Sequence, residues 1–212
     1  CCHAQLKNSI DPSFLYGQNY GFRTSASLTA RQGTEYFADY LHKLFPGRTF
    51  ERVVEFECND AVLLRLLKPR AKKLLGIDPI LKGRESQFND NQITVVGDSI
   101  ETTNFENILG GTPDLIISQH TMEHVENPRQ LVSRLLECAG ANTVFVFEFP
   151  CFDPLLEQLR FDQIFHQHLQ YFSVDSFLRL LKCVDGEVVD YTFNYSYWGS
   201  LLIAFRSKQG SV

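Results

Sequence analysis

Short apolar runs alternate with amphipathic segments along residues 28–205, and this alternation limits the folds open to the chain. Apolar side chains recur every three or four positions along residues 28–44, which predicts a helix that Pro46 and Gly47 end. Further helices are expected at 61–67, 127–138 and 174–181, and strands at 52–57, 73–77, 93–96, 115–118, 143–149, 187–194 and 200–205. Such an alternation predicts an α/β protein with a doubly wound, mostly parallel sheet of about seven strands and helices on both faces.

The composition favours a folded protein that binds neither nucleic acid nor membranes. Of the 212 residues, 44% are hydrophobic and 21% are charged, as in a globular domain. The formal net charge of -5 argues against a nonspecific grip on nucleic acid, which needs a basic surface to displace counterions. The sequence has no signal-peptide pattern and no apolar run near the ~20 residues that span a bilayer. The six cysteines lack the paired spacing of a secreted scaffold, so we expect reduced thiols in a cytoplasmic protein.

Polar residues follow several of the predicted strands. The carboxyl ends of parallel strands share one edge of a sheet, where ligands bind, so we expect these residues to lie together. Asp78 lies about twenty residues beyond the first strand-to-helix turn, the spacing at which a carboxylate accepts hydrogen bonds from ribose hydroxyls. Asp98 ends the third strand, where a carboxylate can meet an adenine amino group. Each of these residues alone is also explained as a turn former or a helix cap.

The order of these motifs resembles that of the class I S-adenosylmethionine-dependent methyltransferases, which have a Rossmann-like fold. After the first strand come "GIDP", "VVGDS" and "PDLIISQHTMEHVENP", as in that family. Past the fifth strand, "FEFPCFDPLLEQLRFDQIFHQHLQYFSVDSF" resembles the sugar C-methyltransferases of deoxysugar biosynthesis, whose signature is E-x-P and then F-D-x-I-Y-H-E-H-x-x-Y-F-S. The lead-in "YGQNYGFRTSASLTARQ" is similar to the segment that precedes the cofactor domain there, and "CCHAQL" resembles the end of an N-terminal zinc module.

The resemblance implies S-adenosylmethionine as cofactor and a small molecule as acceptor, such as a carbon atom of a nucleotide-linked sugar or a related metabolite. It implies a methyltransferase domain at 28–212, preceded at 1–27 by a lead-in that acts as a lid and is the remnant of an upstream zinc module. No metal is expected in this part of the protein. The implied cofactor contacts are Tyr20, Ser25, Glu55, Asn59, Asp78, Asp98, Gln119 and His120.

Two histidines, His166 and His168, lie among aromatic residues in the second half of the chain. Buried polar groups need hydrogen-bond partners. Two histidines among aromatic residues therefore indicate either hydrogen-bonded structural histidines or a catalytic site. His168 occupies the position that the resemblance implies for the general base, and histidine suits this role because its pKa lies near neutrality. We expect His166 to orient the base or to contact the substrate.

The sequence departs from the family pattern at positions where glycine is expected. Glu57 and Ala61 replace the glycines of the first turn, and Glu57 adds a carboxylate where the amino-acid end of the cofactor is expected. Phe165 and Gln167 replace Tyr and Glu beside the histidines, and Trp198 replaces a glycine of the final H-G-G-S element. These residues keep open a second hypothesis, a methyltransferase fold with a blocked pocket that acts as a binding or scaffold domain.

Two other classes of enzyme share parts of the pattern. A nicotinamide-dependent oxidoreductase also places a carboxylate at the position of Asp78, but its pyrophosphate requires a G-x-G-x-x-G turn that is missing here. His120, Glu123 and His124 match the H-x-x-E-H zinc-protease motif, but they directly follow a predicted buried strand instead of lying within a long helix. The oxidoreductase stays an alternative, and we expect His124 to lie near the cofactor or to cap its helix.

Overall fold

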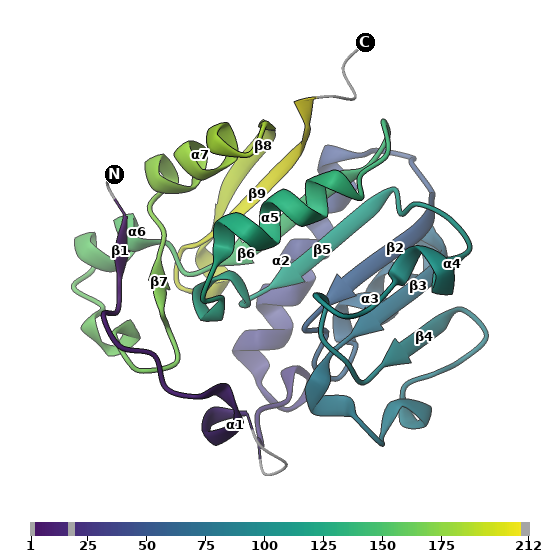
Figure 1. The fold of residues 1–212 in the computed structure, drawn as a ribbon, viewed down its shortest axis with the longest axis horizontal. Coiled ribbons are helices and arrows are strands. Elements are labelled where there is room, and N and C mark those ends of the chain that lie inside the picture. Colours follow the sequence, from purple (N-terminus) through teal and green to yellow (C-terminus); the bar gives the residue numbers. More distant parts are fainter. Residues whose placement is uncertain (1–2, 17–19, 209–212) are drawn as a thin grey trace.

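The chain folds around one large sheet, as the computed structural model shows for the residues that it describes, 3–16 and 20–208 (Figure 1). The strands of this sheet are β2 (Phe50–Phe56), β3 (Ala71–Ile77), β4 (Ile93–Val96), β5 (Leu115–Gln119), β6 (Val144–Phe149), β8 (Gly186–Asn194) and β9 (Ser200–Ser207). Within the described ranges the sheet has seven strands in the order β4-β3-β2-β5-β6-β9-β8. The pairings from β4 to β6 are parallel, whereas β9 pairs antiparallel with β6 and β8. The predicted doubly wound α/β sheet is confirmed.

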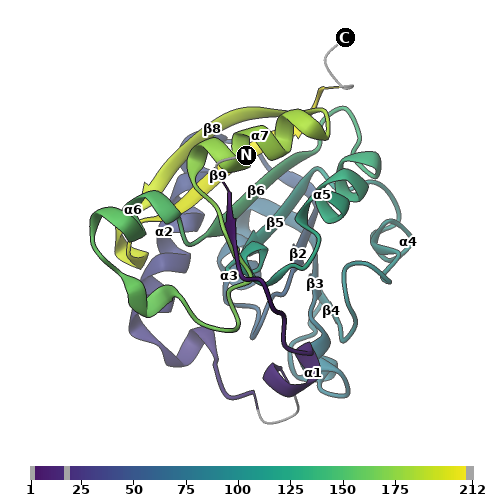
Figure 2. The same cartoon turned by 60° about the vertical axis from the view of Figure 1, so that its left-hand side comes forward.

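Helices cover both faces of the sheet (Figures 1 and 2). The main helices are α2 (Leu28–Leu44) and α3 (Val62–Leu67) on one face, and α4 (Phe105–Leu109), α5 (Pro128–Glu137) and α7 (Val174–Cys183) on the other. The bounds predicted from the sequence for the strands and for α2, α3, α5 and α7 differ from these by at most two residues at either end. Among the residues that the structure describes, none of the helices combines the length and apolar character needed to cross a bilayer.

Each face of the sheet has its own hydrophobic core. Neighbouring residues of a strand point to opposite faces, so Val53 packs in the cluster with Phe37 and Leu41 of α2, whereas Val54 packs in the cluster with Phe177 of α7. Strands buried on both faces are apolar along their whole length. This is the reason why the sequence predicts them well, and their rigid array fixes the positions of the loops at the carboxyl edge.

A small second sheet connects the start of the chain to the segment that contains the predicted histidines. The strand β1 (Ala4–Gln5) pairs antiparallel with β7 (Gln170–Tyr171), and the two lie side by side in Figures 1 and 2. His3 precedes β1, and its Nε2 lies 2.7 Å from Oε1 of Gln170. Of the residues attributed to a zinc-module remnant, Cys1 and Cys2 lie outside the described part of the chain. Two-residue strands have no periodicity, and this pairing was not predicted.

Candidate active site

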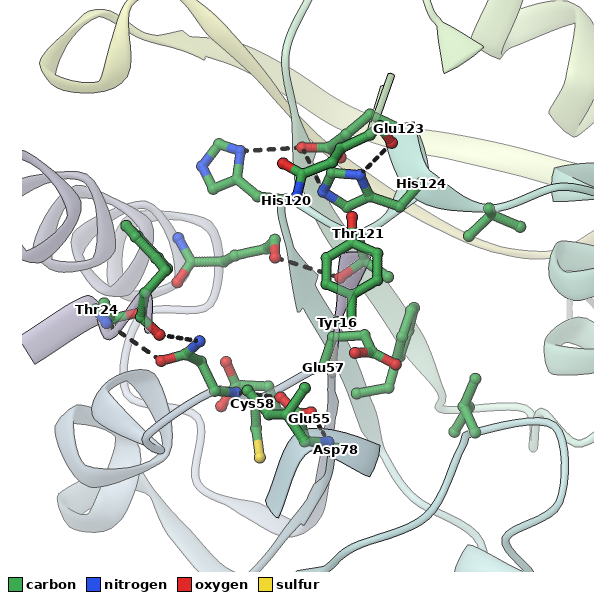
Figure 3. A pocket seen from close by; sticks show the side chains of 18 of the residues that line it. Tyr16, Thr24, Glu55, Glu57, Cys58, Asp78, His120, Thr121, Glu123 and His124 are labelled. Atoms are coloured by element: carbon green, nitrogen blue, oxygen red, sulfur yellow. Dashed lines mark hydrogen bonds and ion pairs between the residues drawn. The ribbon is translucent and has the colours of Figure 1, made fainter. Parts of the chain in front are cut away.

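A cavity of about 970 Å³ opens at the carboxyl edge of the sheet, where β2, β3 and β5 end (Figure 3). Its volume is in the range of sites that enclose a small molecule or a cofactor. Figure 3 shows one group of polar side chains around Asp78 and a second around Glu123, with the ring of Tyr16 drawn between them. The residues predicted from the sequence that line this cavity are Tyr20, Glu55, Asn59, Asp78, Gln119, His120 and His168.

The first strand-to-helix turn has the backbone of a glycine-rich turn without its glycines. Glu57, Asn59 and Ala61 have φ angles of 54°, 49° and 58°, in the left-handed region that favours glycine. Trp198, which replaces the other expected glycine, has a φ of 56°. Left-handed backbone costs roughly 1–2 kcal/mol at a residue other than glycine. The departures from the family pattern therefore keep the backbone conformation that the glycines would adopt, and they change only the side chains.

Asp78 joins the ends of β2 and β3. Its Oδ2 accepts a hydrogen bond from the backbone N–H of Asn59 (2.7 Å), and its Oδ1 accepts one from the N–H of Ile80 (2.9 Å). Burial raises the pKa of the Asp78 carboxyl to about 6, although both N–H donors oppose this shift. Each carboxylate oxygen can accept more than one hydrogen bond, so Asp78 can still bind hydroxyl groups of a ligand.

Glu55 and Glu57 add two carboxyl groups to the same end of the cavity. Glu55 is buried, and no described residue forms a hydrogen bond to its Oε2. Burial, followed by the negative charge of Asp78, raises the pKa of both glutamates well above the ordinary value. This end of the cavity is therefore short of positive charge, and a bound cation would stabilise it.

Asp98 does not line the cavity. Its exposed carboxylate accepts hydrogen bonds from the backbone N–H of Ser99 and from the hydroxyl of Thr102, both at 2.8 Å. The side chain is thus turned back onto its own loop, as carboxylates at turns often are. Ser99 and Ile100 line the cavity in its place.

The lead-in passes over the first turn and closes one side of the cavity. The side-chain amide of Asn59 donates to the carbonyl of Phe22 (3.2 Å), and its Oδ1 accepts from the backbone N–H of Thr24 (3.2 Å). Tyr20, Phe22 and Thr24 line the cavity, whereas Ser25 is exposed and lies outside the lining. Thr24, and not the predicted Ser25, therefore reaches the cavity, and the role of the lead-in as a lid stays a prediction.

The other end of the cavity is organised around Glu123, which is 2% exposed. Its Oε1 lies 3.6 Å from Nδ1 of His120 and 3.9 Å from Nε2 of His124. Burial favours the neutral form of Glu123, but the charges of His124 and His120 outweigh it and lower the pKa of this carboxyl to about 2. Burial likewise disfavours the charged form of His120, but the contact with Glu123 outweighs it and raises the pKa of that imidazole.

Glu148, from the E-x-P motif, supports this end from behind the cavity. It is buried, and its carboxylate accepts hydrogen bonds from Gln119 (2.6 Å), Asn194 (2.8 Å) and Ser200 (2.5 Å). Glu148 does not line the cavity. Its role is to hold Gln119 at the end of β5 and to connect that strand to β8 and β9.

Of the two histidines predicted for the site, His168 lines the cavity and the exposed His166 does not. The buried His168 ring packs against those of Phe165 (4.1 Å between centroids) and His124 (5.2 Å). Its Nδ1 lies 3.0 Å from the carbonyl oxygen of Gln163, so this nitrogen carries the hydrogen and Nε2 keeps its lone pair. Burial lowers the pKa of His168 to about 4, below the near-neutral value expected for the base, and this makes the ring neutral at physiological pH.

The H-x-x-E-H motif does not form the long helix of a zinc protease. Met122–His124 is a single turn of 3-10 helix that comes shortly after β5, and the φ of His120 is 52°. His124 was expected either near the cofactor or as a helix cap. It lines the cavity, and its Nδ1 lies 2.7 Å from the carbonyl oxygen of Gln167. The protease interpretation is therefore rejected.

Several residues of the cavity were not predicted from the sequence. They are mainly apolar or aromatic residues of the connecting segments, such as Tyr16, Phe22, Ile80, Ile100 and Tyr197. Apolar residues in loops carry no signal that separates a ligand contact from a packing contact. The H-x-x-E-H motif in the sequence does mark Glu123 as a candidate site residue. The motif does not show that Glu123 lies beside His168, because His168 comes from a distant segment of the chain.

Comparison with known proteins agrees with this architecture. Residues 29–191 match the family model described as methyltransferase domain. The chain is 24% identical over 211 residues to the C-methyltransferase NovU of Streptomyces niveus, and the match covers 96% of the chain and 48% of the relative. The chain thus spans about half the length of this curated relative.

Solved structures share the fold at low sequence identity. The N-methyltransferase NodS from Bradyrhizobium japonicum WM9, in complex with S-adenosyl-L-homocysteine, aligns with a TM-score of 0.65 and 15% identity over 91% of this chain and 94% of that one. Magnesium protoporphyrin IX methyltransferase from Synechocystis PCC 6803 aligns with a TM-score of 0.61 and 14% identity over 85% and 84% of the two chains. Because the family model matches most of the sequence, the chain belongs to the methyltransferase domain family, whose methyl donor is S-adenosylmethionine.

Proposed function

We propose that this chain is the S-adenosylmethionine-binding domain of an enzyme that methylates a small molecule, with a carbon atom of a nucleotide-linked sugar or a related metabolite as acceptor. The observation that carries the proposal is the convergence of Glu55, Asn59 and Asp78 on one cavity that also contains His168. The relative from Streptomyces niveus is named a C-methyltransferase, which favours carbon as the acceptor atom. The free cysteines Cys58, Cys138, Cys151 and Cys183 suit a reducing compartment, and the proposed location is the cytoplasm.

The residues at the Asp78 end fit the cofactor in charge and in shape. S-adenosylmethionine carries a sulfonium, an ammonium and one carboxylate, so its net charge is positive. Burial raises the pKa values of Glu55, Glu57 and Asp78, and the negative charge of Asp78 adds to the shift of both glutamates. A bound cation would stabilise the charged forms of these carboxyl groups. Ile80 and Ile100 add apolar surface suited to a flat base, and Asp78 keeps acceptor capacity for ribose hydroxyls.

In the proposed methyl transfer the protein positions the acceptor molecule and removes a proton from it. S-adenosylmethionine, when bound, supplies an electrophilic methyl group. His168 is the proposed proton acceptor, because its Nε2 lone pair is free of hydrogen bonds to described residues while the Gln163 carbonyl fixes the tautomer. The lead-in with Tyr20 and Thr24 covers the cavity, which helps to exclude water. A positioned base contributes about 10²–10⁴-fold to the rate.

A matched pair of variants tests the cofactor site. Asp78→Asn removes the buried carboxylate from the cavity, whereas Asp98→Asn removes an exposed carboxylate outside it. A hydrogen bond to a charged group is worth about 1.5–3 kcal/mol, so Asp78→Asn should weaken the binding of S-adenosylhomocysteine roughly ten- to hundredfold. Asp98→Asn should leave the affinity unchanged. Calorimetric titration measures both affinities, and melting without ligand shows whether each variant folds.

Two results would count against the proposal. The first is an equal loss of affinity in both variants, because the Asp78 end of the cavity would then not be the binding site. The second is a rise in melting temperature with NAD and none with S-adenosylhomocysteine, because ligands stabilise the folded state to which they bind. That result would favour the oxidoreductase alternative.

A further inference from the structure

Three side chains at the Glu123 end of the cavity present metal-ligating atoms to one another. They are Glu123, His124 and His168, and one carboxylate oxygen and two ring nitrogens all lie within 4.8 Å of one another. All three residues line the cavity, and Figure 3 shows Glu123 and His124 directed toward each other. His168 reaches this place from a segment more than forty residues away in the sequence, Glu123 and His168 being 45 positions apart.

Hydrogen bonds to the backbone orient both imidazole rings in the same way. Nδ1 of His124 lies 2.7 Å from the carbonyl oxygen of Gln167, and Nδ1 of His168 lies 3.0 Å from that of Gln163. A carbonyl oxygen only accepts, so both Nδ1 atoms donate their hydrogen, and in the neutral form of each ring Nε2 carries the lone pair that can bind a metal ion. Metal-binding histidines are typically held in this way, with the second nitrogen bound to a carbonyl or carboxylate.

Glu123 supplies a buried negative charge. It is 2% exposed, and no described residue forms a hydrogen bond to its Oε2. A buried carboxylate needs a positive partner or hydrogen bonds to offset the cost of leaving water. The nearest cationic candidates among the described residues are His120 and His124, at 3.6 Å and 3.9 Å, longer than a direct hydrogen bond.

We propose that Glu123, His124 and His168 form a binding site for a divalent transition-metal ion of the Zn²⁺ type. Two imidazoles and one carboxylate are a donor set for zinc and its neighbours, whereas Mg²⁺ and Ca²⁺ prefer oxygen ligands alone. Zinc bonds of about 2.0–2.2 Å place tetrahedral ligands about 3.4 Å apart, so small side-chain rotations close the site. Three protein ligands leave the remaining position open to the cavity.

The metal site bears on the proposed function, because the two uses of His168 exclude each other. A metal ion that binds Nε2 removes the lone pair with which His168 would accept a proton. This consequence rests on the proposed function, whereas the binding of the metal does not. Bound Zn²⁺ is therefore expected to inhibit the methyl transfer.

Metal titration of the intact chain tests the site. After chelator treatment, Zn²⁺ is added with calorimetric detection and Co²⁺ with detection by visible absorption. We expect one ion per chain and a Co²⁺ spectrum of nitrogen and oxygen ligands, without the charge-transfer band of a thiolate. Glu123→Gln, His124→Gln and His168→Gln should each weaken the binding at least tenfold. His166→Gln is the matched control, because its ring is exposed and outside the cavity.

The outcomes that would overturn the site are specific. One is zinc affinity that is the same in His168→Gln as in the unchanged chain. Another is affinity that is lost in a Cys1→Ser/Cys2→Ser variant, because the ion would then bind at the start of the chain. Circular dichroism checks folding, and if Glu123→Gln does not fold, the two histidine variants decide. Binding of S-adenosylhomocysteine, measured on the same samples, fails separately if the proposed function is wrong.

Discussion

Glu57 combines two unfavourable features in one residue. Its φ of 54° is costly for any side chain, and its carboxyl group lies close enough to Asp78 for their charges to interact. Burial and the charge of Asp78 raise the pKa of Glu57 well above 4.5, so the folded state holds this proton more tightly than the unfolded state. Above pH 4.5 the folded chain must either keep the proton or bear the repulsion, and stability falls as the pH rises.

Two substitutions at this position separate strain from charge. Glu57→Gly removes both, and it should raise the free energy of unfolding by about 1–2 kcal/mol, a rise in melting temperature of roughly 2–8 °C. Glu57→Gln keeps the strain and removes the charge, so its gain should be small near pH 4.5 and should grow toward neutrality. Urea unfolding at several pH values measures both. Parallel pH profiles for the unchanged chain and Glu57→Gln would contradict the raised pKa.

His168 and His166 allow a similar comparison of a buried and an exposed histidine. With a small molecule that the enzyme methylates as substrate, His168→Gln should lower the turnover about 10²–10⁴-fold. The affinity for S-adenosylmethionine should stay nearly unchanged. His166→Gln should have little effect, because the structure places it outside the cavity. Turnover is measured as formation of S-adenosylhomocysteine. A large loss of cofactor affinity in His168→Gln would make this residue a cofactor contact or a structural residue.

At the scale of elements, the lead-in depends on a few polar contacts with the first turn. Asn59 binds Phe22 and Thr24 at 3.2 Å each, and Asp60 accepts a hydrogen bond from the backbone N–H of Ser25 (3.1 Å). Both residues come shortly after β2, so the same turn that contributes Asn59 to the cavity also holds residues 22–25 of the lead-in. We therefore expect movement of the lead-in and the geometry of the cavity to be coupled.

The variant Asn59→Ala tests this coupling. It should speed amide hydrogen exchange at residues 20–27 and weaken the binding of S-adenosylhomocysteine, while the sheet stays protected. Asn104→Ala is the control, because Asn104 caps α4 by accepting from the N–H of Asn107, and neither residue lines the cavity. The loss of this cap should cost about 1 kcal/mol without affecting the lead-in. Equal exchange at 20–27 in both variants would mean that Asn59 does not hold the lid.

The elements differ in how well the sequence predicts them. Strands such as β5 and β6 are mainly apolar runs. The helix α2 has a clear period and a capping residue, Ser27, whose side chain accepts from the N–H of Ala30. The strands β1 and β7 have two residues each, too few for any periodicity, and only their pairing in space defines them. Short elements depend on tertiary contacts, which a local pattern does not contain.

At the scale of the whole molecule, the cavity is built from segments that are far apart in the sequence. Tyr16, residues 20–24 and residues 163–168 meet the carboxyl ends of β2, β3 and β5 there. The parallel sheet brings its own strand ends together, so Glu55, Asp78 and Gln119 could be predicted from topology alone. Asp98 also follows the end of a parallel strand, but its carboxylate accepts hydrogen bonds from Ser99 and Thr102 of its own loop and does not line the cavity. The grouping of His168 with Glu123 depends on a long loop, for which no such rule exists.

The open cavity argues against the hypothesis of a scaffold domain with a blocked pocket. The replacements Glu57 and Trp198 both line the cavity, yet about 970 Å³ of it stays open. Trp198 is half-exposed, and the guanidinium of Arg160 lies 5.0 Å from its ring, so the side chain lies at the rim and not across the site. The two replacements thus change the lining of the cavity without filling it.

The most direct measurement is a crystal structure of the chain soaked with S-adenosylhomocysteine. We predict density for the adenosyl group beside Asp78, within hydrogen-bond distance of its carboxylate, with the sulfur directed toward the His168 end of the cavity. Density at another place on the chain, or a cavity filled by the Glu57 side chain at saturating ligand, would contradict it.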